Sequence, residues 1–250
     1  RLENNFKLTV EDLKDKVTDR TKLLILPFPN NPTGAIMTRE DLEPIADFLR
    51  GTDIMVLSDE IYSELTYGRK HFSIIELPDM AERTIYVNGF SKAYAMTGWR
   101  LGYVAAPEPI VHQIFKIHQY GIMCSPYISQ NAAIEALTNC DEEVAAMVKE
   151  YNIRRTYLVN EFNRLGLTCF SPEGAFYVFP CIKSTGLSSE EFCERLLFEE
   201  KVAVVPGSAF GDSGEGYIRI SYAYSLKHLM EAISRIEKFI NSLGGEKNEG

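Results

Sequence analysis

The sequence is poor in cysteine and histidine, two residues that often build metal centres. None of its five cysteines forms a Cys-x-x-Cys pair, and their odd number and scattered positions favour reduced side chains in the core over a disulfide framework. They are Cys124, Cys140, Cys169, Cys181 and Cys193. The four histidines are also dispersed, and His112 and His118 are six residues apart, so they do not share a helical face. We therefore predict no metal site.

Long apolar runs and an excess of positive charge are missing too. The longest apolar runs are of strand length, so no transmembrane helix is predicted. With 26 Lys and Arg against 35 Asp and Glu, the net charge is -9, which argues against nucleic acid and anionic membranes as partners. The chain does not open on a signal-peptide pattern, and together with the reduced cysteines this predicts a cytoplasmic protein.

What the sequence does contain is an ordinary globular composition arranged in an α/β pattern. Hydrophobic residues make up 45% of the 250 and charged residues 24%, which suits one large domain or two small ones. Short apolar runs at 22–28, 54–57, 84–87 and 102–106 alternate with helical patterns, which predicts βαβ units and a mainly parallel sheet. The first run is continuously apolar, as expected for a strand buried on both faces.

The pattern changes in the second half of the chain. A long helical pattern at 142–165 has its apolar residues near one stripe. Short strand patterns follow near residue 167 and at 175–179, 202–205 and 217–224. Ser188 begins a helix in a capping box, and a last helix covers 226–243. The polar tail, 244–250, is expected to be disordered. This half therefore has an α+β organisation.

One stretch, residues 88–103, holds a lysine in unusual surroundings. It follows an apolar run and places Ser91 beside Lys92, with Arg100 downstream. A Lys-Ser pair is ordinarily solvated, but here the flanks are aromatic and small apolar residues. Attack on a carbonyl requires a neutral amine, which such surroundings favour, so Lys92 suits a Schiff-base role. Ser91 and Arg100 would offer a hydroxyl and a fork of donors suited to phosphate.

This stretch, from Ser91-Lys92 to Gly98-Trp99-Arg100, resembles the cofactor-lysine segment of class I aminotransferases of fold type I, which use pyridoxal 5'-phosphate (PLP). Two further motifs match in the same order. Asn30-Asn31-Pro32-Thr33-Gly34 resembles the family's Asn-Pro-Thr-Gly turn, and Ser58-Asp59-Glu60-Ile61-Tyr62 resembles its Asp-x-x-Tyr element. Alone, the first would be read as a turn and the second as a strand end with a core tyrosine; three ordered matches are a strong signal.

The resemblance implies an α/β fold in two parts. Residues 1–140 would form part of a mainly parallel-sheet, PLP-binding large domain, and residues 141–250 a smaller α+β C-terminal domain. The chain begins at Arg1, and the resemblance implies that roughly the first third of the family's chain is absent, including the helix N-terminus that binds phosphate. We therefore expect a truncated chain that has little or no activity by itself.

The resemblance also implies a role for each motif residue. Lys92 would carry PLP and move a proton between substrate and cofactor, and Asp59 would keep the pyridine nitrogen protonated. Tyr62 would direct its hydroxyl at the ring oxygen, and Asn31 would bind the same oxygen and reach the substrate carboxylate. The predicted catalytic residues are Lys92, Asp59 and Tyr62, and the predicted cofactor ligands are Asn31, Asp59, Tyr62, Ser91, Lys92 and Arg100.

Arg219 lies in an alternating strand pattern at 217–222. Alternation puts Ile218 and Ile220 on one face of the strand and Arg219 on the other. A strand arginine usually points to solvent or pairs with an acid. In the family that these motifs resemble, however, an arginine at this place binds the substrate α-carboxylate through two hydrogen bonds. The resemblance therefore predicts that Arg219 binds substrate, together with Asn31.

The predicted function is that of a homodimeric aminotransferase acting on an amino acid and a 2-oxo acid. One alternative is a PLP-dependent carbon–sulfur β-lyase of the same fold, although those enzymes tend to depart from the Asp-x-x-Tyr and Thr-Gly-Trp-Arg patterns that this chain keeps. A second alternative is an aminotransferase-like sensor domain of a transcription regulator. A degenerate, non-enzymatic scaffold is opposed by the intact set of Lys92, Asp59 and Arg219.

Overall fold

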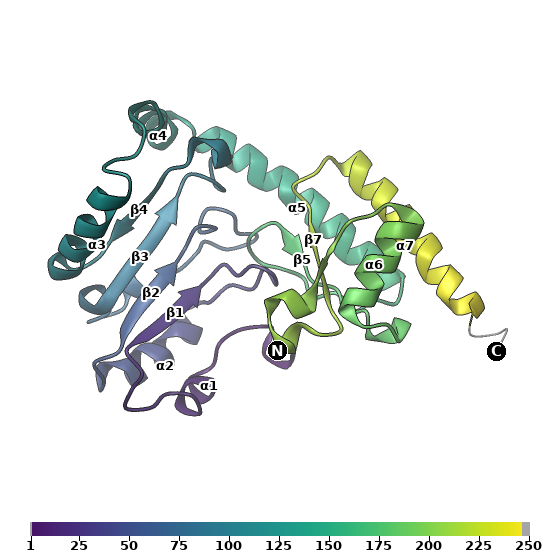
Figure 1. Cartoon of the computed structure of the whole chain (residues 1–250), viewed down its shortest axis with the longest axis horizontal. Helices are drawn as coiled ribbons and strands as arrows, with labels where there is room; N and C mark the ends of the chain where they lie inside the picture. The colour runs from purple at the N-terminus through teal and green to yellow at the C-terminus, as the bar shows by residue number, and fades with distance from the viewer. Residues whose placement is uncertain (1, 247–250) are drawn as a thin grey trace.

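A four-stranded mixed sheet organises the first part of the chain. The computed structural model describes residues 2–246, and Figure 1 shows them as two parts joined by a long helix. The strands are β1 (Leu23–Pro27), β2 (Met55–Asp59), β3 (Thr84–Gly89) and β4 (Gly102–Ala105), in the order β1-β2-β3-β4. The first three are parallel and β4 is antiparallel to β3. The prediction of an α/β fold with a mainly parallel sheet is confirmed.

Helices α1 and α2 begin at threonine caps and cover one face of this sheet. Thr9 and Thr38 each close a capping box, before α1 (Val10–Lys14) and α2 (Arg39–Arg50). The helix α2 continues through Pro44 from its start at Arg39. Its fully buried apolar residues share a core with residues of β1 and β2. This core includes Leu26, Leu42, Ile45, Leu49 and Val56.

The prediction that the first strand is buried on both faces is wrong for the described residues. Leu26 of β1 is 3% exposed beneath α2, whereas Leu23 and Ile25 on the opposite face are 43% and 60% exposed. A continuous apolar run shows that both faces avoid water, but not which segment covers each face. Within residues 2–246, helices α1 and α2 supply the cover for one face only.

A long helix, α5 (Asp141–Arg164), runs from the first part to the second (Figure 1). Helices α3 (Glu108–Gly121) and α4 (Tyr127–Asn139) precede it beyond β4. The second part has a small antiparallel sheet in the order β5-β7-β6, with β5 at Tyr177–Val178, β7 at Ile218–Ser221 and β6 at Val205–Pro206. Helices α6 (Ser189–Glu200) and α7 (Leu226–Glu246) complete it.

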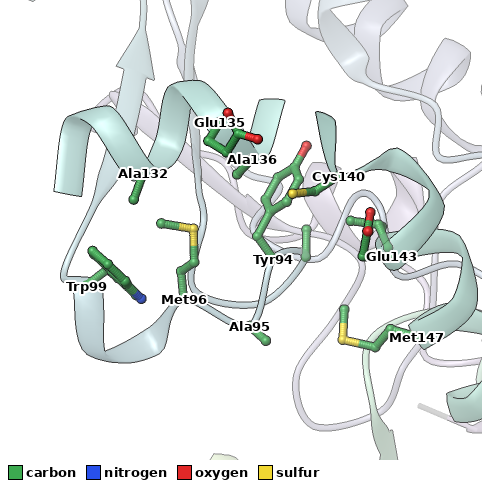
Figure 2. Close-up of a pocket in the computed structure, with 12 residues that line it drawn as sticks. Tyr94, Ala95, Met96, Trp99, Ala132, Glu135, Ala136, Cys140, Glu143 and Met147 are labelled. Atoms are coloured by element: carbon green, nitrogen blue, oxygen red, sulfur yellow. The ribbon is translucent and has the colours of Figure 1, made fainter. Parts of the chain in front are cut away.

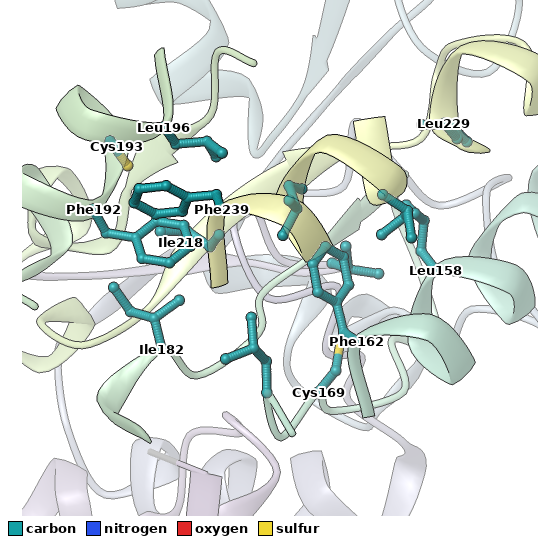
Figure 3. Packing of buried hydrophobic residues seen from close by; sticks show 14 of the residues in the cluster. Leu158, Phe162, Cys169, Ile182, Phe192, Cys193, Leu196, Ile218, Leu229 and Phe239 are labelled. Atoms are coloured by element: carbon teal, nitrogen blue, oxygen red, sulfur yellow. The ribbon is translucent and has the colours of Figure 1, made fainter. Parts of the chain in front are cut away.

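Aromatic and branched side chains from these helices and strands form the core of the second part. Phe192 of α6 meets Phe239 of α7 edge to face, with ring centroids 5.2 Å apart. Phe162 of α5 and Ile218 of β7 are fully buried in the same cluster (Figure 3). Short 3-10 helices occur at Leu2–Asn4, Ile74–Glu76, Ala81–Arg83, Thr97–Trp99, Lys183–Thr185, Gly207–Phe210 and Asp212–Gly214.

Several predicted boundaries in the second part differ from the structure. No β-strand forms near residue 167, because the backbone there makes isolated hydrogen bonds. For example, the Cys181 N–H donates to the Thr168 carbonyl. Ser188 caps α6 by accepting the Glu191 N–H, without the reciprocal bond of a capping box. The helix α7 reaches Glu246, so the start of the tail is helical, and residues 247–250 lie outside the described residues.

No described helix is both long and apolar enough to cross a bilayer.

The two parts touch through segments that are distant in sequence. The Phe6 ring, which precedes α1, packs edge to face on Phe179 and Tyr217 of the second part. The Tyr67 N–H donates to the Glu173 carbonyl at 2.9 Å, which links the loop after β2 to the loop before β5. We propose the boundary between residues 140 and 141, with Phe6 packed across it.

Candidate active site

The turn after β1 docks directly on the second part. Gly34 has a φ of +69°, and a Cβ there would lie 2.3 Å from the Pro172 Cβ, so only glycine fits this close approach. The Gly34 carbonyl accepts the N–H groups of Glu173 and Gly174 at 2.9 and 2.8 Å. This turn therefore fixes Asn31, which precedes it, beside the loop that leads into β5.

The carboxyl end of β2 presents Asp59 and Tyr62. Asp59 is half-buried, and its Oδ1 accepts the Ile61 N–H at 3.2 Å. Tyr62 is buried, and its hydroxyl lies 3.0 Å from the hydroxyl of Tyr177. Burial is the largest cause that raises the pKa of Tyr62 well above its ordinary value. Tyr62 is therefore a hydrogen-bond donor at every ordinary pH.

A buried carboxylate anchors the loop that carries Tyr62. Glu60 is 2% exposed, and it accepts hydrogen bonds from the hydroxyls of Ser58 and Ser73 at 2.8 and 2.6 Å. Its other oxygen lies 2.5 Å from His71 Nε2. Glu60 thus ties the start of loop 61–73 to its end, which restricts how far Tyr62 can move.

Lys92 follows β3 and faces the second part. Its side chain is half-buried, and Nζ lies 5.9 Å from the centre of the Phe176 ring. Its neighbours Phe90, Ala93 and Met96 are buried. Lys92 therefore extends from apolar surroundings toward Phe176, the neighbour of Tyr177.

Thr97 closes the loop between Ser91 and Arg100. The Thr97 hydroxyl donates to the Ser91 carbonyl at 3.1 Å, and Arg100 Nη1 donates to the Thr97 carbonyl at 2.9 Å. Arg100 is exposed and has a left-handed backbone, with φ of +54°. The loop holds Ser91 and Arg100 near one another, but no described contact joins Arg100 to Lys92.

Arg219 reaches from β7 back to the first part. Its Nη1 donates to Asn31 Oδ1 at 2.9 Å, and its Cζ lies 4.6 Å from the ring centre of Tyr177 and 5.1 Å from that of Phe210. Its Nε is buried and has no hydrogen-bond partner among the described residues. A guanidinium that keeps a buried donor free is suited to an anion with two oxygens, such as a carboxylate.

These contacts bring most of the predicted site residues into one place. Asp59 is the last residue of β2, and Asn31 and Lys92 follow the carboxyl ends of β1 and β3, where open α/β sheets bind ligands. Arg219 contacts Asn31 across the two parts, and both Arg219 and Asp59 act electrostatically on the hydroxyl of Tyr62. An amine, a carboxylate, a phenol and a free guanidinium donor therefore converge, and this donor set fits PLP with an amino-acid substrate.

Three aromatic residues of this site were not predicted from the sequence. Phe176 lies beside the amine of Lys92, and Tyr177 and Phe210 lie beside the guanidinium of Arg219. In the sequence they read as ordinary strand or loop aromatics, because their partners are far away along the chain. Tyr62 and Tyr177, for example, are separated by 115 positions. The sequence does show the aromatic pair Phe176-Tyr177. It does not show the strand register that places this pair beside Arg219.

A separate apolar cavity lies behind the lysine loop. It measures about 350 Å3, and Figure 2 shows Met96 and Trp99 from that loop facing helix α4, with Cys140 and Met147 on the side of α5. Its other lining residues are Ala93, Tyr94, Ala95, Ala132, Glu135, Ala136, Glu143 and Val144. None of the predicted site residues lines it, so this cavity is adjacent to the candidate site and is not part of it.

The fold and these side chains define a two-part α/β protein with a candidate ligand site at the carboxyl ends of its parallel strands. Residues 1–236 match the family described as aminotransferase class I and II. The chain therefore belongs to the class I and II aminotransferase family. Proteins of this family use PLP.

Two relatives and one solved structure illustrate the similarity. The aromatic-amino-acid aminotransferase 2 of Thermococcus litoralis is 50% identical over 241 residues, and the aspartate aminotransferase of Pyrococcus abyssi is 51% identical over 243. Each match covers 95% of this chain and 62% of the relative. The crystal structure of an aromatic aminotransferase from Pyrococcus horikoshii matches with a TM-score of 0.95 and 48% identity, over 97% of this chain and 66% of that one. The chain thus spans less than two thirds of the length of these proteins.

Proposed function

We propose that the protein is a PLP-dependent aminotransferase that moves an amino group between an amino acid and a 2-oxo acid. The main support for this proposal is the hydrogen bond between Arg219 and Asn31, because it joins the two parts of the protein at the guanidinium. The Nε of this guanidinium has no hydrogen-bond partner among the described residues. The two relatives named above are an aromatic-amino-acid aminotransferase and an aspartate aminotransferase, which supports the same type of reaction here.

The residues of the first part suit the cofactor ring. When bound, PLP supplies an electron sink for the Cα of the substrate. The Lys92 amine is the group that binds the cofactor aldehyde and, when released, moves a proton at Cα. The Asp59 carboxylate accepts a hydrogen bond from the pyridine nitrogen and keeps it protonated. The Tyr62 hydroxyl, which burial keeps protonated, donates to the ring oxygen.

The remaining residues bind the anionic groups. Arg219 pairs with the substrate α-carboxylate through a planar fork of donors. Asn31 holds the guanidinium in place by accepting a hydrogen bond from Arg219 Nη1. The amide group of Asn31 also reaches the ring oxygen or the carboxylate. Ser91 and Arg100 lie on the loop that Thr97 closes, and they are the residues we assign to the phosphate.

A cytoplasmic homodimer is part of the same proposal. The five free cysteines support a reducing compartment. Helices α3 and α4 expose large apolar side chains, among them Ile117, Tyr120 and Tyr127 at 77%, 95% and 78% exposure. Contiguous exposed apolar residues of this kind mark interaction surfaces, and we assign this one to contact with a second copy.

The test is a transamination assay on the full-length protein, with aspartate or an aromatic amino acid as donor and 2-oxoglutarate as acceptor. We expect the donor's 2-oxo acid to form in repeated turnovers, beyond one equivalent per enzyme, only when the acceptor and PLP are both present, at a rate on the order of 1–10³ s⁻¹. The Lys92→Ala variant should lose this activity. Formation of a 2-oxo acid with ammonia, without any acceptor, would instead indicate a lyase.

A further inference from the structure

Tyr177 is the residue at which the two ends of the proposed site meet. It is 7% exposed, its hydroxyl lies 3.0 Å from that of Tyr62, and its ring centre lies 4.6 Å from the Cζ of Arg219. The sheet register explains this double contact. Tyr177 of β5 pairs with Ser221 of β7, so Arg219, two residues earlier on the same face, is its diagonal neighbour.

The hydroxyl contact has one direction that suits catalysis. Tyr62 carries a single O–H, and if this proton is donated to the ring oxygen of PLP, the Tyr62 oxygen can only accept from Tyr177. Burial keeps Tyr62 protonated by raising its pKa. The other charged groups that act on Tyr62 are Asp59 and Arg219, which oppose each other in sign. Tyr177 is therefore the neutral donor that can tune Tyr62.

The ring contact has a different consequence. The Arg219 guanidinium lies near the rings of both Tyr177 and Phe210, with Cζ 4.6 and 5.1 Å from their centres, while Asn31 accepts from one of its nitrogens. Two aromatic neighbours and one hydrogen bond fix the orientation of the guanidinium before any ligand arrives. The buried Nε remains the free donor of this arrangement.

We propose that Tyr177 is a positioning residue for both halves of the reaction: its hydroxyl strengthens the donation of Tyr62 to the cofactor ring, and its ring orients Arg219 for the substrate carboxylate. This inference rests on the proposed function. Hydrogen bonds in a chain strengthen one another, so loss of the Tyr177 hydroxyl weakens the next bond in the chain. The two roles belong to different atoms of one side chain and can be separated by substitution.

The experiment compares two substitutions in the full-length protein loaded with PLP. Tyr177→Phe removes only the hydroxyl, and we expect the pH midpoint of the bound cofactor's absorbance to rise by a few tenths of a unit, on the order of 0.3, with little change in KM for the amino acid. Tyr177→Leu also removes the ring, and we expect KM to rise by roughly three- to tenfold in addition.

Tyr67→Phe is the matched control. Tyr67 is buried to the same extent, at 6% exposure, and its hydroxyl donates to the Ala175 carbonyl, which the Tyr222 hydroxyl also binds. It makes no described contact with Tyr62 or Arg219, so its loss should move neither the absorbance midpoint nor KM. Circular dichroism of each variant checks that it folds.

A double-mutant cycle with Tyr62→Phe decides whether Tyr177 acts through Tyr62. We expect the absorbance shift caused by Tyr177→Phe to vanish in the Tyr62→Phe background. An additive shift, or equal shifts from Tyr177→Phe and Tyr67→Phe, would overturn the inference while leaving the proposed function intact. Failure of the unmodified protein to bind PLP at all would overturn both.

Discussion

Glu60 should be one of the most sensitive positions in the first part of the chain, although it touches no ligand in the proposed site. Its carboxylate is 2% exposed and accepts hydrogen bonds from two buried hydroxyls, those of Ser58 and Ser73. It also pairs with His71 Nε2 at 2.5 Å. Through these partners it closes loop 61–73, which carries Tyr62 and bonds to the second part.

The loss of stability caused by Glu60→Ala can be worked out from the hydrogen-bond donors that lose their acceptor. Ser58, Ser73 and His71 would each lose a buried acceptor, at about 1–3 kcal/mol apiece, with water entry lowering the sum. We therefore expect a loss of roughly 3–6 kcal/mol in the free energy of unfolding. Glu60→Gln keeps the shape and an acceptor oxygen, so its cost should be about 1–2 kcal/mol. Glu64→Ala, an exposed glutamate in the same loop, should stay within about 0.5 kcal/mol.

Thermal unfolding of the full-length protein, followed by circular dichroism, measures this order. At about 2–4 °C for each kcal/mol in a domain of this size, Glu60→Ala should lower Tm by roughly 6–24 °C. A Tm for Glu60→Ala within about 1–2 °C of that for Glu64→Ala would refute the view that the Glu60 cluster anchors the loop.

Three further predictions concern the site and the core. Asp59→Asn should spare much of the PLP binding, measured by absorbance, but lower kcat strongly, because a neutral amide does not hold the pyridine nitrogen protonated; near-normal turnover would contradict that role. Arg219→Lys keeps the charge but loses the planar fork, so KM for amino acids should rise while the cofactor still binds; an unchanged KM and kcat would make Arg219 a structural residue. Burial raises the pKa of the Cys169 and Cys193 thiols to about 12, so alkylation at pH 8 should label the exposed Cys124 first and reach these two only on unfolding. Equal labelling of all three in the native protein would show that the core is not packed as described.

Elements with strong periodicity were predictable from the sequence. The helical stripe at 142–165 became α5 (Asp141–Arg164), and the predicted capping residue Ser188 precedes α6 (Ser189–Glu200). These features depend on neighbours within one or two turns of the chain, which the sequence displays directly. The three ordered motifs also indicated the family through their residue matches, and each lies at the end of a parallel strand.

Features that depend on distant partners were not predictable. The exposed face of β1 could not be seen, since an apolar run does not reveal what covers it. Cys124 was expected in the core but is exposed, because it lies in the turn between α3 and α4. Tyr177 was missed because its partners, Tyr62 and Arg219, are brought to it only by the docking of one part on the other and by the register of β5 with β7.

The assignment of Lys92 as the cofactor lysine is the central claim, and one measurement tests it most directly. The full-length protein is incubated with PLP, reduced with borohydride, digested and mapped by mass spectrometry. We predict a pyridoxyl label on Lys92, the half-buried lysine whose Nζ faces the Phe176 ring. The Lys92→Arg variant serves as the control and should carry no label. A label on any other lysine, or none on the unmodified protein, would contradict the account.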